Sequence, residues 1–75
     1  MITVKVIHKA SGDPWKDQKV AIGIDGFFSG GVTNYVYTDD NGEAHFDLKP
    51  ANGKVYVNGN TVHEGYLSGR IVVYI

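Results

Sequence analysis

The chain has 75 residues, with no cysteine, ten glycines, and seven basic against eight acidic side chains. This length allows a single domain spanning residues 1–75, and the lack of cysteine excludes disulfide bonds, thiolate metal sites and a cysteine nucleophile. The formal net charge of −1 predicts no binding to nucleic acid or to an anionic membrane surface, and no apolar run approaches the roughly 18 residues of a membrane-spanning helix.

The first half of the chain contains two runs in which apolar residues stand at every second position, the period of a strand with one buried face. The apolar members of these runs are Ile2, Val4 and Val6, followed by Val20, Ile22 and Ile24. A longer connection follows each run: residues 10–17 carry Trp15, and residues 26–33 carry Phe27 and Phe28. Loops on a rigid scaffold commonly hold binding residues, so both connections are candidate binding segments.

The second half predicts further strands. Segment 34–38 has the composition of a strand, although Tyr35 and Tyr37 compete with Val36 for the inner face. Clear alternation follows at Ala44, Phe46 and Leu48, at Val55 and Val57, and at Ile71, Val73 and Ile75. Segment 61–67 alternates weakly and is predicted as a strand as well. No window shows the 3.6-residue period of an amphipathic helix.

Three Asn-Gly pairs predict tight hairpins, because type I′ turns need positive φ at both central residues. They are Asn41-Gly42, Asn52-Gly53 and Asn58-Gly59. Six to seven short antiparallel strands separated by such turns indicate an all-β fold, and we interpret it as a β-sandwich rather than a small barrel.

Three motifs follow one another over about residues 10–58: Gly12-Asp13-Pro14 before a strand, Thr38-Asp39-Asp40-Asn41-Gly42 at a turn, and Gly53-Lys54-Val55-Tyr56-Val57 in a strand. Together they resemble the bacterial immunoglobulin-like and prealbumin-like modules, namely collagen-adhesin B-type repeats and carboxypeptidase regulatory-like domains. The resemblance implies a Greek-key sandwich of seven strands and a non-enzymatic binding, spacer or stalk role.

The chain departs from two known members of these families. Many collagen-adhesin modules carry an isopeptide bond from a lysine to Asn or Asp. Lys5 could supply the lysine, but residues 70–75 contain neither acceptor, so we predict no isopeptide bond. The transthyretin-related hydrolases end in a Tyr-Arg-Gly-Ser tail, whereas this chain ends in Tyr74-Ile75. The resemblance therefore concerns the fold and implies no particular activity.

Residues that could support catalysis or metal binding form no recognised pattern. His8, His45 and His63 lie on different predicted strands without the spacing of metal ligands, and His8 and His45 are expected to face opposite sides. The segment Asp39-Asp40-Asn41-Gly42 fails as a calcium loop, because aromatic and aliphatic residues hold the positions of the required acidic ligands. We predict no metal, no cofactor and no catalytic residues. A small hydrolase-like or metal-dependent enzyme that uses the histidines is an alternative.

Aromatic side chains form the remaining candidate site. Tyrosines at outward positions of a sandwich can create an amphipathic patch whose hydroxyl groups make hydrogen bonds. The predicted binding residues are Trp15, Phe27, Phe28, Tyr35 and Tyr37. We expect a small binding or structural module with a protein partner, and carbohydrate binding is the alternative. In the competing interpretation, Trp15, Phe27 and Phe28 only close the ends of the core.

The final strand, Ile71 to Ile75, is the most apolar and carries no charge after Arg70. At a sheet edge such a strand invites pairing with another chain. We therefore expect it either to lie centrally in its sheet or to form a homodimer. Two locations are consistent with the sequence: cytoplasmic if Met1 is the native start, and extracellular if the chain was excised from a longer surface protein.

Overall fold

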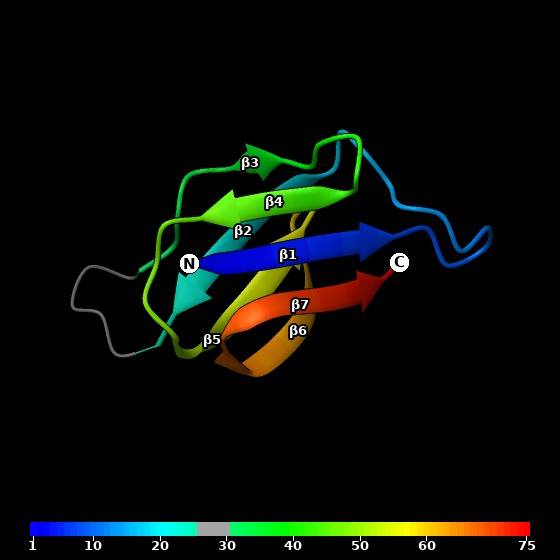
Figure 1. Ribbon diagram of the computed structural model, residues 1–75. Coiled ribbons are helices and arrows are strands. Elements are labelled where there is room, and N and C mark those ends of the chain that lie inside the picture. Colours follow the sequence, from blue (N-terminus) through cyan, green and yellow to red (C-terminus); the bar gives the residue numbers. More distant parts are fainter. Residues whose placement is uncertain (26–30) are drawn as a thin grey trace.

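The computed structural model describes residues 1–25 and 31–75, and these residues form seven strands (Figure 1). The strands are β1 (Ile2–Ile7), β2 (Lys19–Ile24), β3 (Val36–Tyr37), β4 (Glu43–Phe46), β5 (Ala51–Val57), β6 (Asn60–Leu67) and β7 (Gly69–Tyr74). Helices are absent from the described residues, so this part of the chain offers none that could cross a membrane.

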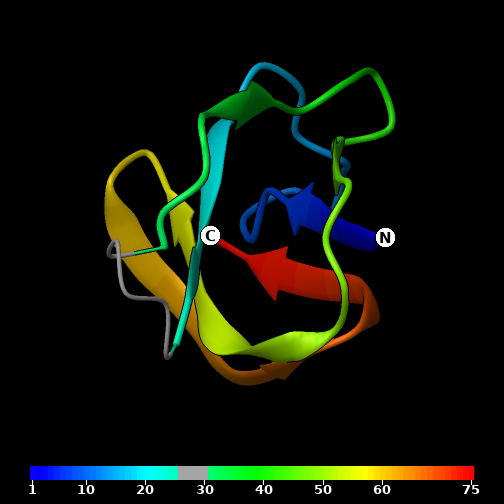
Figure 2. The same cartoon turned by 90° about the vertical axis from the view of Figure 1, so that its left-hand side faces the viewer.

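The strands form two sheets that pack against each other as a sandwich (Figure 2). One sheet has the order β4-β1-β7 and the other has the order β3-β2-β5-β6. This arrangement confirms the prediction of an all-β sandwich. The weakly alternating segment 61–67 is a strand and belongs to the four-stranded sheet, where β6 pairs antiparallel with β5.

The core lies between the sheets and is built from the alternating apolar residues. Its largest fully buried side chains are Ile2, Val4, Val6, Val20, Ile22, Val55, Val57 and Leu67. Thr38 is the one buried polar side chain among the described residues. Its hydroxyl donates to the Trp15 carbonyl oxygen at 2.7 Å and accepts from the Gln18 amide at 2.9 Å. These two bonds hold the connection after β1 against the segment that follows β3.

One pairing contradicts the expectation that all strands are antiparallel. The first and last strands, β1 and β7, run parallel, in a register from Ile2 opposite Gly69 to Ile7 opposite Tyr74. Hairpin signals specify only strands that are neighbours in sequence, whereas the whole intervening chain separates β1 from β7 and leaves their relative direction free. Strand β7 lies at the sheet edge, and no other described strand pairs with its outer side.

The three Asn-Gly pairs have three different roles. Asn58-Gly59 forms the predicted hairpin between β5 and β6, with φ angles of 52° and 85°. Asn41-Gly42 forms a turn, but it connects β3 to β4 in the opposite sheet rather than closing a hairpin. The prediction of a turn at Asn52-Gly53 is wrong, because both residues lie inside β5. There a Cβ atom on Gly53 would overlap the carbonyl oxygen of Gly23 on β2, so glycine permits the close approach of these strands.

Candidate binding surface

The outer face of the four-stranded sheet collects aromatic side chains from several strands. Val20 on β2 is buried and pairs with Val36 and Val57. Because successive residues of a strand point to opposite faces, Lys19 and Ala21 lie on the outer face. Their partners in register, Tyr37 opposite Lys19 and Tyr56 opposite Ala21, lie there too.

A shallow depression of about 180 Å³ opens on this face. Its lining residues are Lys19, Ala21, Val32, Tyr35, Tyr56 and Gly59. Ala21 is only 3% exposed although it belongs to the outer face, which places it at the floor. The Tyr56 ring lies across Gly23, where a Cβ atom would approach ring atom Cε2 to 3.0 Å. The small residues of β2 therefore create the space that the Tyr56 ring occupies over this strand.

A positive charge stands at the rim of the depression. The Lys19 Nζ atom is 4.3 Å from the centroid of the Tyr35 ring, within the range of a cation–π interaction. Tyr35 itself is 61% exposed. The depression thus combines an apolar floor, two aromatic rings and one ammonium group, which suits an apolar or aromatic group that carries a neighbouring negative charge.

Two further tyrosines extend this face toward the sheet edges. Tyr37 on β3 is exposed, and so is Tyr66 on β6, whose neighbour Leu67 is buried in the core. The equally exposed Tyr74 belongs to β7 and therefore to the other sheet. We call Tyr35, Tyr37, Tyr56 and Tyr66 the tyrosine face.

The structure separates the five binding residues predicted from the sequence. Tyr35 lines the depression, and Tyr37 lies on the same face. Trp15 is half-buried and packs against the core, with the His8 ring edge-on to it at a centroid distance of 4.2 Å. Phe27 and Phe28 lie outside the described residues.

Sequence reasoning missed most of the residues that line the depression. Lys19, Ala21 and Tyr56 come together only through the register that sets β2 against β3 and β5. The alternation within each run does predict that these three residues point outward. It does not predict which strands are neighbours, because the strand order depends on pairings across the whole sheet.

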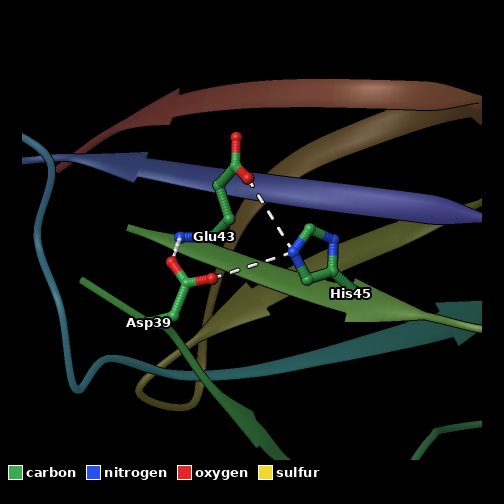
Figure 3. A group of neighbouring side chains, drawn as sticks. All are labelled: Asp39, Glu43 and His45. Carbon is green, nitrogen blue, oxygen red and sulfur yellow. Dashed lines mark hydrogen bonds and ion pairs between the residues drawn. The ribbon is translucent and has the colours of Figure 1, made fainter. Parts of the chain in front are cut away.

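A second group of polar side chains lies at the other sheet, where Asp39 from the turn before β4 and Glu43 and His45 from β4 point toward one another (Figure 3). His45 Nε2 is 3.8 Å from an oxygen of Asp39 and 3.8 Å from an oxygen of Glu43. The Asp39 carboxylate also accepts backbone N–H bonds from Glu43 at 3.0 Å and Asn41 at 2.9 Å. The bond from Glu43 is the main cause that lowers the pKa of Asp39 below its usual 3.8.

The three histidines have separate environments. His8 contacts Trp15 and its Nδ1 is 3.1 Å from the Ser11 hydroxyl. His45 belongs to the acidic group on β4, and His63 lies on β6 of the opposite sheet. Within residues 1–25 and 31–75, the group of three potential ligand residues contains one histidine and two acids. The alternative of an enzyme that uses several histidines together gains no support from this arrangement.

No family model matches the chain, and no curated protein or solved structure matches it at a significant level.

Proposed function

We propose that the protein is a non-enzymatic binding module that recognises another protein through the tyrosine face. The observation that carries this proposal is the depression between Tyr35 and Tyr56, with Ala21 at its floor and Lys19 at its rim. Tyrosines are frequent at the energetically dominant positions of protein interfaces, because they bury a large apolar surface and keep a polar end.

The size of the depression favours a single side chain as its occupant. Pockets for drug-sized ligands hold roughly 300–1,000 Å³, whereas a cavity of about 150 Å³ accommodates a benzene ring. The depression, at about 180 Å³, is close to the second value. The expected partner presents one aromatic or branched aliphatic side chain, with an aspartate or glutamate nearby to meet Lys19.

The strand arrangement also bears on which of the two kinds of module the chain resembles. In chain order, strands 1, 4 and 7 form one sheet and strands 2, 3, 5 and 6 form the other. A constant immunoglobulin domain instead places strands 1, 2, 4 and 5 in one sheet. The arrangement therefore differs from a constant immunoglobulin domain, and the prealbumin-like module is the resemblance that we retain in this proposal.

The experiment is a selection from a phage-displayed peptide library with the wild-type protein as target. We expect enriched peptides to share an apolar anchor and an acidic neighbour. Tyr35→Ser should then weaken their binding by about tenfold or more, the effect of losing a dominant interface tyrosine. Tyr74→Ser is the matched control, since Tyr74 is 62% exposed but lies on the other sheet.

Two outcomes contradict the proposal. Selected peptides that bind the Tyr35→Ser and Tyr74→Ser variants equally well would remove the tyrosine face from recognition. A glycan array that shows saturable binding sensitive to Tyr35→Ser, together with a failed peptide selection, would establish carbohydrate binding in its place.

A further inference from the structure

We propose that Asp39, Glu43 and His45 form a binding site for a divalent transition-metal ion such as Zn²⁺. This site lies on the three-stranded sheet and is independent of the tyrosine face. Each of the three residues offers one ligand atom, and these atoms all lie within 4.8 Å of one another (Figure 3). Imidazole nitrogen and carboxylate oxygen are both established ligands of Zn²⁺.

The two distances from His45 require only a small adjustment to accept an ion, whereas the ligand oxygens of Asp39 and Glu43, which are held only within 4.8 Å of each other, must approach further. Ligands bound to Zn²⁺ at about 2.0–2.2 Å in a tetrahedron are roughly 3.4 Å apart. His45 Nε2 is already 3.8 Å from Asp39 Oδ2 and 3.8 Å from Glu43 Oε1. The His45 and Asp39 side chains are 47% and 48% exposed, so both can move toward Glu43 and an ion can reach them.

Neighbouring hydrogen bonds orient the candidate ligands. The Thr3 hydroxyl on β1 lies 2.9 Å from His45 Nδ1, and when it accepts the Nδ1 proton the lone pair of Nε2 faces the two carboxylates. A histidine that binds a metal usually has its second nitrogen held in this way. Asp39 Oδ1 accepts the backbone N–H groups of Asn41 and Glu43, which leaves Oδ2 for an ion.

The charges around the group are two carboxylates and two basic side chains, of which Arg70 makes an ion pair with Glu43 and competes with a bound cation. Two carboxylates converge on one point, and Arg70 approaches only the far oxygen of Glu43, with its Nε atom 3.5 Å from Oε2. Lys5 lies opposite Glu43 in the β1–β4 register. The imidazole ligand distinguishes the expected ion, because nitrogen ligands suit Zn²⁺ and its transition-metal neighbours, whereas Ca²⁺ and Mg²⁺ prefer oxygen alone.

The test is a calorimetric titration of the full chain with Zn²⁺ alone near neutral pH. We expect one ion per chain, and each of Asp39→Asn, Glu43→Gln and His45→Gln should weaken binding by about tenfold or more. Asn at position 39 keeps an oxygen for the turn hydrogen bonds, so the turn is retained. Asp40→Asn is the matched control, because it removes the same charge from the same turn outside the group and should change the affinity less than about twofold.

Arg70→Gln provides a test in the opposite direction. Removing the competing cation beside Glu43 should tighten Zn²⁺ binding by about threefold or more. Amide spectra by NMR confirm that each variant is folded and show whether the ion perturbs His45 and its neighbours. The proposal fails if the wild type shows no saturable binding, if His45→Gln binds Zn²⁺ as tightly as the wild type, or if Ca²⁺ binds as tightly as Zn²⁺.

Discussion

Gly53 is the residue on which the pairing of β2 with β5 depends most directly. The carbonyl oxygen of Gly23 occupies the space where any larger residue at position 53 would place its Cβ atom. Gly53 lies opposite Ile24 in the register, at the end of β2. A small residue is therefore needed here for steric reasons, and no turn is involved.

We expect Gly53→Ala to lower the free energy of unfolding by about 2–4 kcal/mol, because backbone atoms cannot move aside as a flexible side chain can. The measurement is urea unfolding followed by circular dichroism. Asn52→Ala is the control, since Asn52 is the exposed neighbour in the same strand and its replacement should change stability by less than about 0.5 kcal/mol. If Gly53→Ala is as stable as the control, β2 and β5 can move apart enough to admit a Cβ atom without a loss of stability, and the prediction is wrong.

Thr38, in the segment that follows β3, is a second residue whose contacts reach a distant part of the chain. Its hydroxyl bonds to the Trp15 carbonyl and the Gln18 amide, and its backbone N–H donates to the Gln18 carbonyl at 3.0 Å. Thr38 is also the first residue of the Thr-Asp-x-x-Gly motif noted in the sequence. The first residue of that motif therefore binds the connection between β1 and β2, while the rest of the motif forms the turn.

Thr38→Val keeps the shape of the side chain and removes both hydroxyl bonds. We expect it to lower the free energy of unfolding by about 1–3 kcal/mol, because two backbone groups in a partly buried site lose their partners. Thr61→Val on the exposed part of β6 is the control and should be nearly neutral. If the two variants are equally stable in urea unfolding, water replaces the two hydrogen bonds of the Thr38 hydroxyl with no change in the free energy of unfolding.

At the scale of the elements, alternation within the sequence located nearly every strand. Alternation did not predict the length or register of a strand where these depend on contacts between distant segments. Strand β3 is only Val36–Tyr37, because pairing with β2 extends over two residues. The bulge between Val55 and Tyr56 inserts a residue into the β5–β6 register, which explains why segment 61–67 alternates weakly.

The edge position of β7 supports a prediction about assembly. Its backbone pairs with β1 on one side, and no described strand covers the other side. Edge strands are usually protected by charges or by shortness, but β7 has six residues and Arg70 as its one charge. We expect the protein to self-associate through this edge as concentration rises, as the homodimer hypothesis from the sequence requires.

Size-exclusion chromatography with light scattering measures this directly. Val72→Lys adds a charge to the middle of β7, where Val72 is 42% exposed, and should shift the protein toward the monomer. Tyr37→Lys on the short strand β3 of the other sheet is the control and should leave the distribution unchanged. A strict monomer at high concentration would rule out the homodimer.

At the scale of the whole molecule, the sequence predicted the class of fold and part of the candidate surface. The all-β sandwich followed from the two-residue period. Tyr35 and Tyr37 are exposed, whereas the sequence left open whether they or Val36 face inward. The grouping of Asp39, Glu43 and His45 was not foreseen, because the turn and the start of β4 were considered separately. Their convergence depends on the path of the chain between the two sheets.

The parallel pairing of β1 with β7 has a mechanical consequence. The two termini leave this pair at opposite ends (Figure 1). A force applied between Met1 and Ile75 therefore slides one strand along the other and loads the hydrogen bonds of the ladder together. Because β1 and β4 are antiparallel, with Ile2 opposite Phe46, a force applied between Met1 and Asp47 instead opens the bonds one after another.

Single-molecule pulling compares the two geometries in the same protein. We expect a clearly higher rupture force for attachment at positions 1 and 75 than for attachment at positions 1 and 47. Equal forces would mean that the β1–β7 ladder does not resist the load. If the expectation holds, the pair of strands that joins the two termini resists load better than the neighbouring β1–β4 pair.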